Sequence, residues 1–212
     1  MRKPEPAVNR AGGAVLAATL CYLSAPADAA TVAIAVNGGS GGALNAVVYA
    51  MPIGGNPPRS APRSVIMDQI NKEFVPFVAP VQAGTSVTFP NKDNIRHHVY
   101  SFSPAKAFDL KLYSGVAARP VLFEKPGPVA LGCNIHDWMV AYIYVVDSPW
   151  FTKTDKAGAA SLDLPGGEYD VKVWHPWQTT EAAAQRIKVG AGDARLAFQV
   201  DIVTPKQVKA PQ

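Results

Sequence analysis

Cysteine is scarce in this sequence of 212 residues, with only Cys21 and Cys133 present. The apolar run from Ala11 to Leu23 is too short to span a bilayer comfortably. Basic residues are scattered along the chain and do not cluster with aromatic residues, which argues against a nucleic-acid partner. We therefore expect no transmembrane segment in the mature chain and no nucleic-acid interface.

The N-terminus has the layout of a secretory signal peptide. Basic residues precede the apolar run, and the small-residue pattern Ala27-Asp28-Ala29 follows it. We expect residues 1–29 to be removed near Ala29 and the mature protein to be exported to the periplasm. An uncleaved membrane anchor or a disordered tail is the alternative.

Only one of the two cysteines is expected in the mature chain. Cys21 would leave with the signal peptide, and Leu20 before it is not the small residue that lipid attachment requires. The mature chain would then hold a single cysteine in an oxidising compartment, where it cannot form an intramolecular disulfide. Cys133 is either an inert buried thiol or a thiolate protected by a metal.

Composition predicts an all-β protein. The chain is 48% apolar, and its 19 prolines and 17 glycines interrupt it at short intervals, which favours many short strands. Eight strand-like segments follow one another in the middle of the chain, at 64–70, 73–78, 85–90, 97–102, 108–113, 120–124, 128–133 and 139–146. They are enough for a β-sandwich, and we assign residues 58–148 to one such domain.

The flanking segments also have strand patterns but cannot form a core alone. Two strands are expected before residue 52, and four more between 154 and 202. We infer that residues 30–57 and 149–203 together form a small discontinuous β-sandwich, with the middle domain inserted between its second and third strands. Residues 204–212 are expected to be a flexible tail.

The segment CNIHDWM, from Cys133 to Met139, combines three side chains that bind copper. Thiolate and imidazole suit copper, and blue-copper sites use two histidines and one cysteine with a weak axial methionine. His136 supplies one histidine, and the segment NKDNIRHHVYSF offers His97 or His98 as the other. Neighbouring residues of a strand point to opposite faces, so only one of those two can face the site.

These motifs resemble the cupredoxins, and the short ligand loop is most similar to amicyanin. The resemblance covers residues 63–147, rests on FPNKDNIRHHV and Cys-x-x-His-x-x-Met, and implies a Greek-key β-sandwich with one type 1 copper ion. It implies the four ligands His97, Cys133, His136 and Met139. It leaves His98 to pack or to form a hydrogen bond.

The whole chain is also similar to bacterial proteins usually called methylamine utilization proteins or plastocyanin-like proteins. The flanking strands resemble a transthyretin-like or carboxypeptidase-regulatory sandwich, mainly through TDKAGAASLDLPGGEYDVKV. Two positions depart from the cupredoxin pattern: His98 stands where asparagine is usual, and Asp137 where amicyanin-like loops have proline. Asn134 could replace the side-chain link that the usual asparagine makes between the two ligand loops.

The resemblance implies an electron carrier that alternates between Cu(II) and Cu(I) and exchanges electrons with redox partner proteins. His136 would be the electron port, with Trp138 and Met139 in an apolar docking patch around it. No substrate is turned over, so we do not expect an enzyme. A copper-trafficking protein, or a glycan- or protein-binding module with a secondary copper site, is the alternative.

Two features of the C-terminal segment stay outside the copper site. His175 has no cysteine or second histidine near it in the sequence and is expected to be structural or at the surface. Trp174 and Trp177 either cover the small sandwich or form a surface for a partner.

Overall fold

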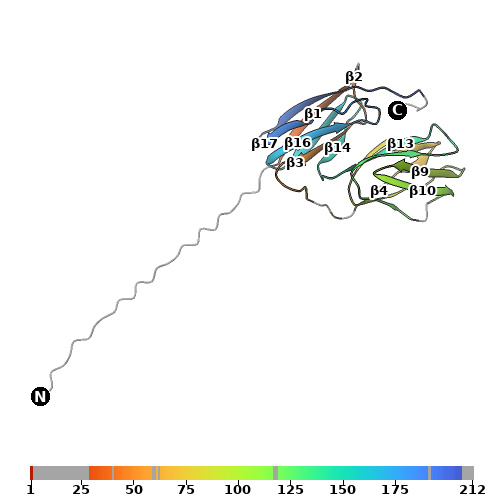
Figure 1. Ribbon diagram of the computed structural model, residues 1–212, viewed down its shortest axis with the longest axis horizontal. Coiled ribbons are helices and arrows are strands. Elements are labelled where there is room, and N and C mark those ends of the chain that lie inside the picture. Colours follow the sequence, from red (N-terminus) through yellow and green to blue (C-terminus); the bar gives the residue numbers. More distant parts are fainter. Residues whose placement is uncertain are drawn as a thin grey trace.

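The computed structural model describes Met1 and residues 29–39, 41–58, 61, 63–116, 119–190 and 192–206. Within these ranges the chain forms eighteen strands and no helix, which confirms the all-β prediction (Figure 1). The predicted signal peptide, apart from Met1 and Ala29, and the end of the predicted tail lie outside the described residues. No helix long and apolar enough to cross a membrane occurs in the part of the chain that is described.

Ten strands in the middle of the chain form what we call the middle sandwich. Its five-stranded sheet has the order β10 (Lys106–Tyr113), β9 (His97–Ser103), β12 (Gly127–Gly132), β13 (Val140–Val146) and β7 (Val78–Gln82). Its second sheet has the order β11 (Val121–Phe123), β8 (Thr85–Thr88) and β4 (Ser64–Ile66). A separate hairpin joins β5 (Asp68–Ile70) to β6 (Glu73–Val75).

Two of the eight predicted segments are broken into shorter strands. The segment 64–70 is interrupted at Met67, whose side chain is fully buried, so that β4 pairs with β8 while β5 pairs with β6. The segment 73–78 is interrupted at Pro76, which follows a cis peptide bond and has no N–H to continue a ladder. These breaks place the β5–β6 hairpin apart from the two large sheets.

The remaining strands form a second pair of sheets, which we call the outer sandwich. One sheet has the order β15 (Ala159–Leu164), β1 (Ala30–Gly38) and β18 (Ala194–Val200), with β2 (Gly41–Gly42) paired to β1. The other has the order β14 (Phe151–Lys153), β3 (Val47–Pro52), β16 (Gly167–Trp174) and β17 (Gln185–Val189). The short strands β2 and β14 were not predicted.

Strands from both ends of the chain therefore share the sheets of the outer sandwich. In β1, alternate side chains are buried, and this strand pairs with β15 in antiparallel and with β18 in parallel orientation. Figure 1 shows the orange N-terminal strands beside the blue C-terminal strands, next to the yellow and green middle sandwich. The chain passes through the whole middle sandwich between β3 and β14.

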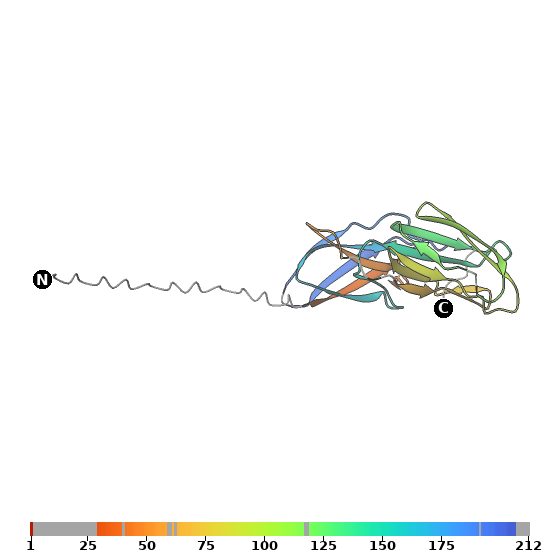
Figure 2. The same cartoon turned by 90° about the horizontal axis from the view of Figure 1, so that it is seen from below.

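Each sandwich has its own apolar core, and a third buried cluster joins them. The joining cluster centres on Val47, Val78 and Val146. Around it the rings of Tyr144 and Trp174 stack with centroids 4.7 Å apart, and further aromatic rings surround them. Burying one such aliphatic side chain contributes about 1.5–3 kcal/mol, so this cluster stabilises the contact between the two sandwiches, which lie next to each other in Figure 2.

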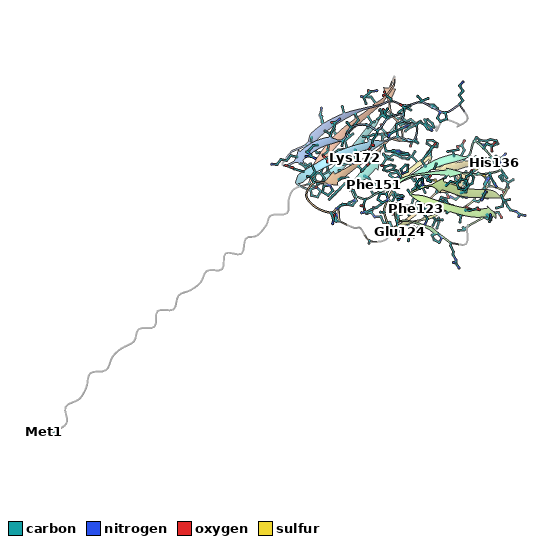
Figure 3. The ribbon with its side chains drawn as sticks, in the orientation of Figure 1. Met1, Phe123, Glu124, His136, Phe151 and Lys172 are labelled. Atoms are coloured by element: carbon teal, nitrogen blue, oxygen red, sulfur yellow. The ribbon has the colours of Figure 1, made fainter. Side chains whose placement is uncertain are left out.

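The middle sandwich positions the copper motif at its edge. The CNIHDWM loop begins where β12 ends and finishes where β13 begins, and Gly132 pairs with Tyr100 of the neighbouring β9. This pairing brings the start of β9 close to the loop. Figure 3 shows His136 at the far end of the middle sandwich, while Phe151 lies toward the outer sandwich.

Candidate metal centre

Three of the four predicted copper ligands come together in space. One donor atom each from His97, Cys133 and His136 lies within 4.8 Å of the other two. The Sγ atom of Cys133 is 4.0 Å from Nδ1 of His136, and the two imidazole rings have centroids 5.1 Å apart. No other cluster of three such side chains occurs among the described residues.

The ligand loop is tightly turned. The N–H of Met139 donates to the carbonyl of His136 at 2.9 Å, and the N–H of Val140 donates to the carbonyl of Trp138 at 3.0 Å. These bonds fold the loop back on itself between two paired strands. Consequently Cys133 is buried while His136 remains partly exposed.

Strand alternation in β9 separates the two adjacent histidines, as predicted. His97 is fully buried and faces the cluster, whereas His98 points to the outer face of the sheet. There His98 forms a hydrogen bond through Nε2 with the carboxylate of Asp109. The structure thus brings His97, and not His98, beside Cys133 and His136.

The two nitrogens of His97 are in different situations. Its Nε2 is 2.7 Å from a carboxylate oxygen of Asp93, while its buried Nδ1 has no hydrogen-bond partner among the described residues. A buried polar atom without a partner needs an explanation. The Asp93 contact favours the tautomer that carries its proton on Nε2, which leaves an Nδ1 lone pair for a metal.

Asp93 is a functional candidate that the sequence motifs did not identify. Besides His97, its carboxylate accepts the backbone N–H groups of Asn71 and Lys72 at 2.7 and 2.8 Å. Those two residues have positive φ angles of 55° and 60° and form the turn of the β5–β6 hairpin. The only sequence signal was a carboxylate four residues before His97. Asp93 therefore connects that histidine to a turn that lies far away in the sequence.

Electrostatics at the site favour neutral imidazole and ionised carboxylate. Desolvation is the largest cause that lowers the pKa of His136, and smaller electrostatic contributions from His97 and Lys72 act in the same direction. Desolvation opposes ionisation of Asp93, but hydrogen bonds from Lys72, His97 and Asn71 outweigh it and lower the pKa of the carboxyl group. Both shifts favour the protonation states that a metal ligand and its supporting carboxylate need.

The fourth predicted ligand, Met139, lies in the core beneath the loop. Its side chain is 1% exposed and belongs to the same buried cluster as Cys133. The expected role of Met139 in a surface docking patch is therefore wrong, because its side chain does not reach the surface. The exposed apolar residues of the loop are Ile135 and Trp138, and the Trp138 ring lies 5.1 Å from that of His136.

The side-chain hydrogen bond between the ligand loops that was expected from Asn134 is not present. Asn134 is exposed, and its side chain forms no hydrogen bond within the described part of the chain. Its neighbours in a shallow surface depression include His98 and Lys111. The link between the ligand loops is made instead by the β9–β12 pairing and by the core beneath them.

His175 is structural, as expected. Its Nε2–H donates to the carbonyl of Leu44 at 3.1 Å, and its Nδ1 accepts the backbone N–H of Trp177 at 3.2 Å. Trp177 in turn contacts Phe77 of the middle sandwich, with ring centroids 5.3 Å apart. Trp177 and Trp174 both pack where the two sandwiches meet.

Comparison of the sequence with protein-family models and with curated proteins finds no match. Part of the structure is similar to a copper-containing nitrite reductase from Thermus scotoductus, with 24% identity and a TM-score of 0.37, over 45% of this chain and 25% of that protein. The chain thus spans about a quarter of the length of that reductase.

Two smaller copper proteins are also similar over part of the chain. A purple cupredoxin from Nitrosopumilus maritimus has 20% identity and a TM-score of 0.35, over 39% of this chain and 99% of that protein. A Cu(I) form of an amicyanin variant has 17% identity and a TM-score of 0.36, over 39% of this chain and 82% of that protein.

Proposed function

We propose that the chain binds one copper ion through His97, Cys133 and His136, with Met139 as a weak fourth ligand, and carries single electrons between redox partner proteins. The observation that carries the proposal is that His97, whose buried Nδ1 has no hydrogen-bond partner among the described residues, lies in a cluster with a thiol and a second imidazole. This donor set is the one that type 1 copper sites use.

Each residue has a separate task. Asp93 holds the His97 ring and its tautomer, so that Nδ1 stays directed at the cluster. Burial of Cys133 and Met139 excludes water from the sulfur ligands. Copper, when bound, supplies the change between Cu(II) and Cu(I). The rigid β-scaffold keeps the donors in place in both states.

His136 is the exit and entry point for the electron. Its ring is partly exposed at the end of the middle sandwich, with the exposed side chains of Ile135 and Trp138 beside it (Figure 3). A small apolar patch around a partly exposed ligand suits brief contact with a partner protein. The chain carries electrons without turning over a substrate, so we do not assign it an enzymatic activity.

Export of the protein belongs to the same proposal. The basic, apolar and small-residue pattern at the N-terminus supports cleavage near Ala29 and a periplasmic location. A single buried thiol held by a metal would then be protected from oxidation. The proposed domain boundaries, 30–57 with 149–203 and 58–148, and a link to methylamine metabolism remain predictions.

The experiment must separate an electron carrier from a copper-trafficking protein. The copper-loaded protein is reduced and reoxidised with inorganic one-electron reagents in a stopped-flow instrument, and its Cu(I) form is challenged with a Cu(I) chelator. A carrier exchanges electrons within milliseconds and releases copper only over hours. Rapid loss of copper to the chelator combined with slow electron exchange would contradict the carrier and favour trafficking.

A further inference from the structure

A cleft of about 640 Å³ lies where the metal loop, the β5–β6 hairpin and the outer sandwich meet. Trp138 and Met139 line it from the metal loop, and Asn45 and Lys153 line it from the outer sandwich. Its size is within the range of small-molecule sites, which are often found at domain interfaces. The three clustered donors His97, Cys133 and His136 do not line this space, although the cleft borders the proposed copper site through Met139 and the proposed docking patch through Trp138.

Asn45 supplies an unused polar group to the cleft. The residue is only 6% exposed, yet its side-chain amide forms no hydrogen bond within the described ranges. Its backbone is held in place, because its N–H donates to the carbonyl of Thr154 at 3.3 Å and its φ angle is 66°. Its amide atoms are not among the fully buried polar atoms, so they can be reached from the cleft and are available for a ligand.

Lys153 supplies a positive charge. Its Nζ donates to the carbonyl of Val78 at 3.1 Å, which uses one of the three donors of the ammonium group. Burial lowers the pKa of Lys153. A carboxylate ligand would compensate the half-buried charge.

The acidic residues of the cleft already have partners. One carboxylate oxygen of Asp155 accepts the backbone N–H groups of Ala157 and Ala159 at 2.8 and 2.9 Å. Glu73 is also engaged within the chain. Lys153, in contrast, forms no ion pair among the described residues, so it is a cation with which an incoming anion can pair.

The walls of the cleft suit a flat apolar group. The side chain of Trp138 is 46% exposed although it is large and apolar. Phe77 and Val140 line the same cleft. An aromatic ring inserted here would cover apolar surface that is now in contact with water.

We propose that the cleft binds a small aromatic carboxylate, with the carboxylate at Lys153 and Asn45 and the ring against Trp138. The site adjoins Met139 on one side and, through Trp138, the ring of His136 on the other. A bound ligand would thus touch the loop that carries three of the four proposed copper ligands.

Isothermal titration of the metal-free protein with benzoate tests the proposal, with acetate, benzamide and benzylamine as comparison probes. Benzoate is expected to bind, and each comparison probe, which lacks the ring, the negative charge or the correct sign of charge, is expected to bind at least about tenfold more weakly. No benzoate binding at millimolar concentration, or equal binding of benzylamine, overturns the proposal.

Three single-residue variants test where benzoate binds. Lys153→Met and the isosteric Asn45→Asp are each expected to weaken benzoate binding about tenfold or more, while Lys111→Met, on the outer face of the middle sandwich, leaves it unchanged. Equal affinity in all three variants would place benzoate elsewhere and overturn the proposal. If Lys153→Met fails to fold, Asn45→Asp and the probe series decide. Because the titration needs no copper, its result is independent of the proposed electron transfer.

Discussion

Replacement of Asp93 by asparagine tests how the fold prepares the first histidine for a metal. Three N–H groups point at this carboxylate, from Asn71 at 2.7 Å, Lys72 at 2.8 Å and His97 at 2.7 Å. Asparagine has the same shape but only one acceptor oxygen, so at least one of these N–H groups would face an amide N–H instead. A lost hydrogen bond to a charged group costs about 1.5–3 kcal/mol, and we expect Asp93→Asn to lower the free energy of unfolding by about 2–3 kcal/mol.

Loss of the Asp93 contact should also weaken metal binding. Removing a carboxylate that supports a ligating histidine typically costs about 10–100-fold in metal affinity, and we expect a loss of that size for Cu(II). The affinity is measured by competition with a chelator of known strength, and the stability of the metal-free protein by urea unfolding. The matched control is Asp109→Asn, which removes the partner of His98 on the outer face and is expected to change affinity less than about threefold. Equal effects of the two substitutions would refute the role assigned to Asp93.

Three further predictions concern Asp93, the two adjacent histidines and the junction of the two sandwiches. The pKa of Asp93 is lowered on folding, so its stabilising contribution is present above the unfolded pKa of about 3.9 and is lost as the pH falls through the folded value. In urea unfolding, the difference in free energy of unfolding between the protein and Asp93→Asn should be constant from about pH 7 to 5 and should shrink below about pH 4. A difference that is the same at all pH values would contradict this. His97→Asn should reduce Cu(II) affinity more than about a hundredfold, whereas His98→Asn should keep it within about threefold of that of the unchanged protein. A similar loss in both variants would show that the strand face is wrongly assigned. Trp174→Ala, which removes the ring stacked on Tyr144, should lower the free energy of unfolding in urea by roughly 3 kcal/mol. Replacing the half-exposed Trp138 by alanine should lower it by less than about 1 kcal/mol. Equal losses in the two variants would contradict the packing of the junction.

The parts of the site that follow one strand or one loop could be predicted from the sequence. Alternation along β9 separated His97 from His98, because the period of a strand puts neighbours on opposite faces. The spacing of Cys133 and His136 predicted a single loop, and the structure places both in the cluster with His97. The turn-rich composition predicted the all-β class.

Features that depend on contacts between distant segments were not predicted. Asp93 acts through the turn of a hairpin at residues 71–72, and no local pattern relates that turn to His97. The break at Met67 is similarly hidden, because the segment 64–70 is apolar enough for one strand while its two halves pair with different partners. The buried position of Met139 depends on how the loop folds back onto the core, which its spacing alone does not define.

The most direct test of the account is the visible absorption and electron paramagnetic resonance spectrum of the purified protein with one equivalent of Cu(II), recorded beside Cys133→Ser. The account predicts an intense blue charge-transfer band and a narrow copper hyperfine splitting, both lost in the variant, because the thiolate of Cys133 would be the source of the transition. A pale spectrum with ordinary hyperfine splitting that is the same in both proteins would contradict the proposed copper site.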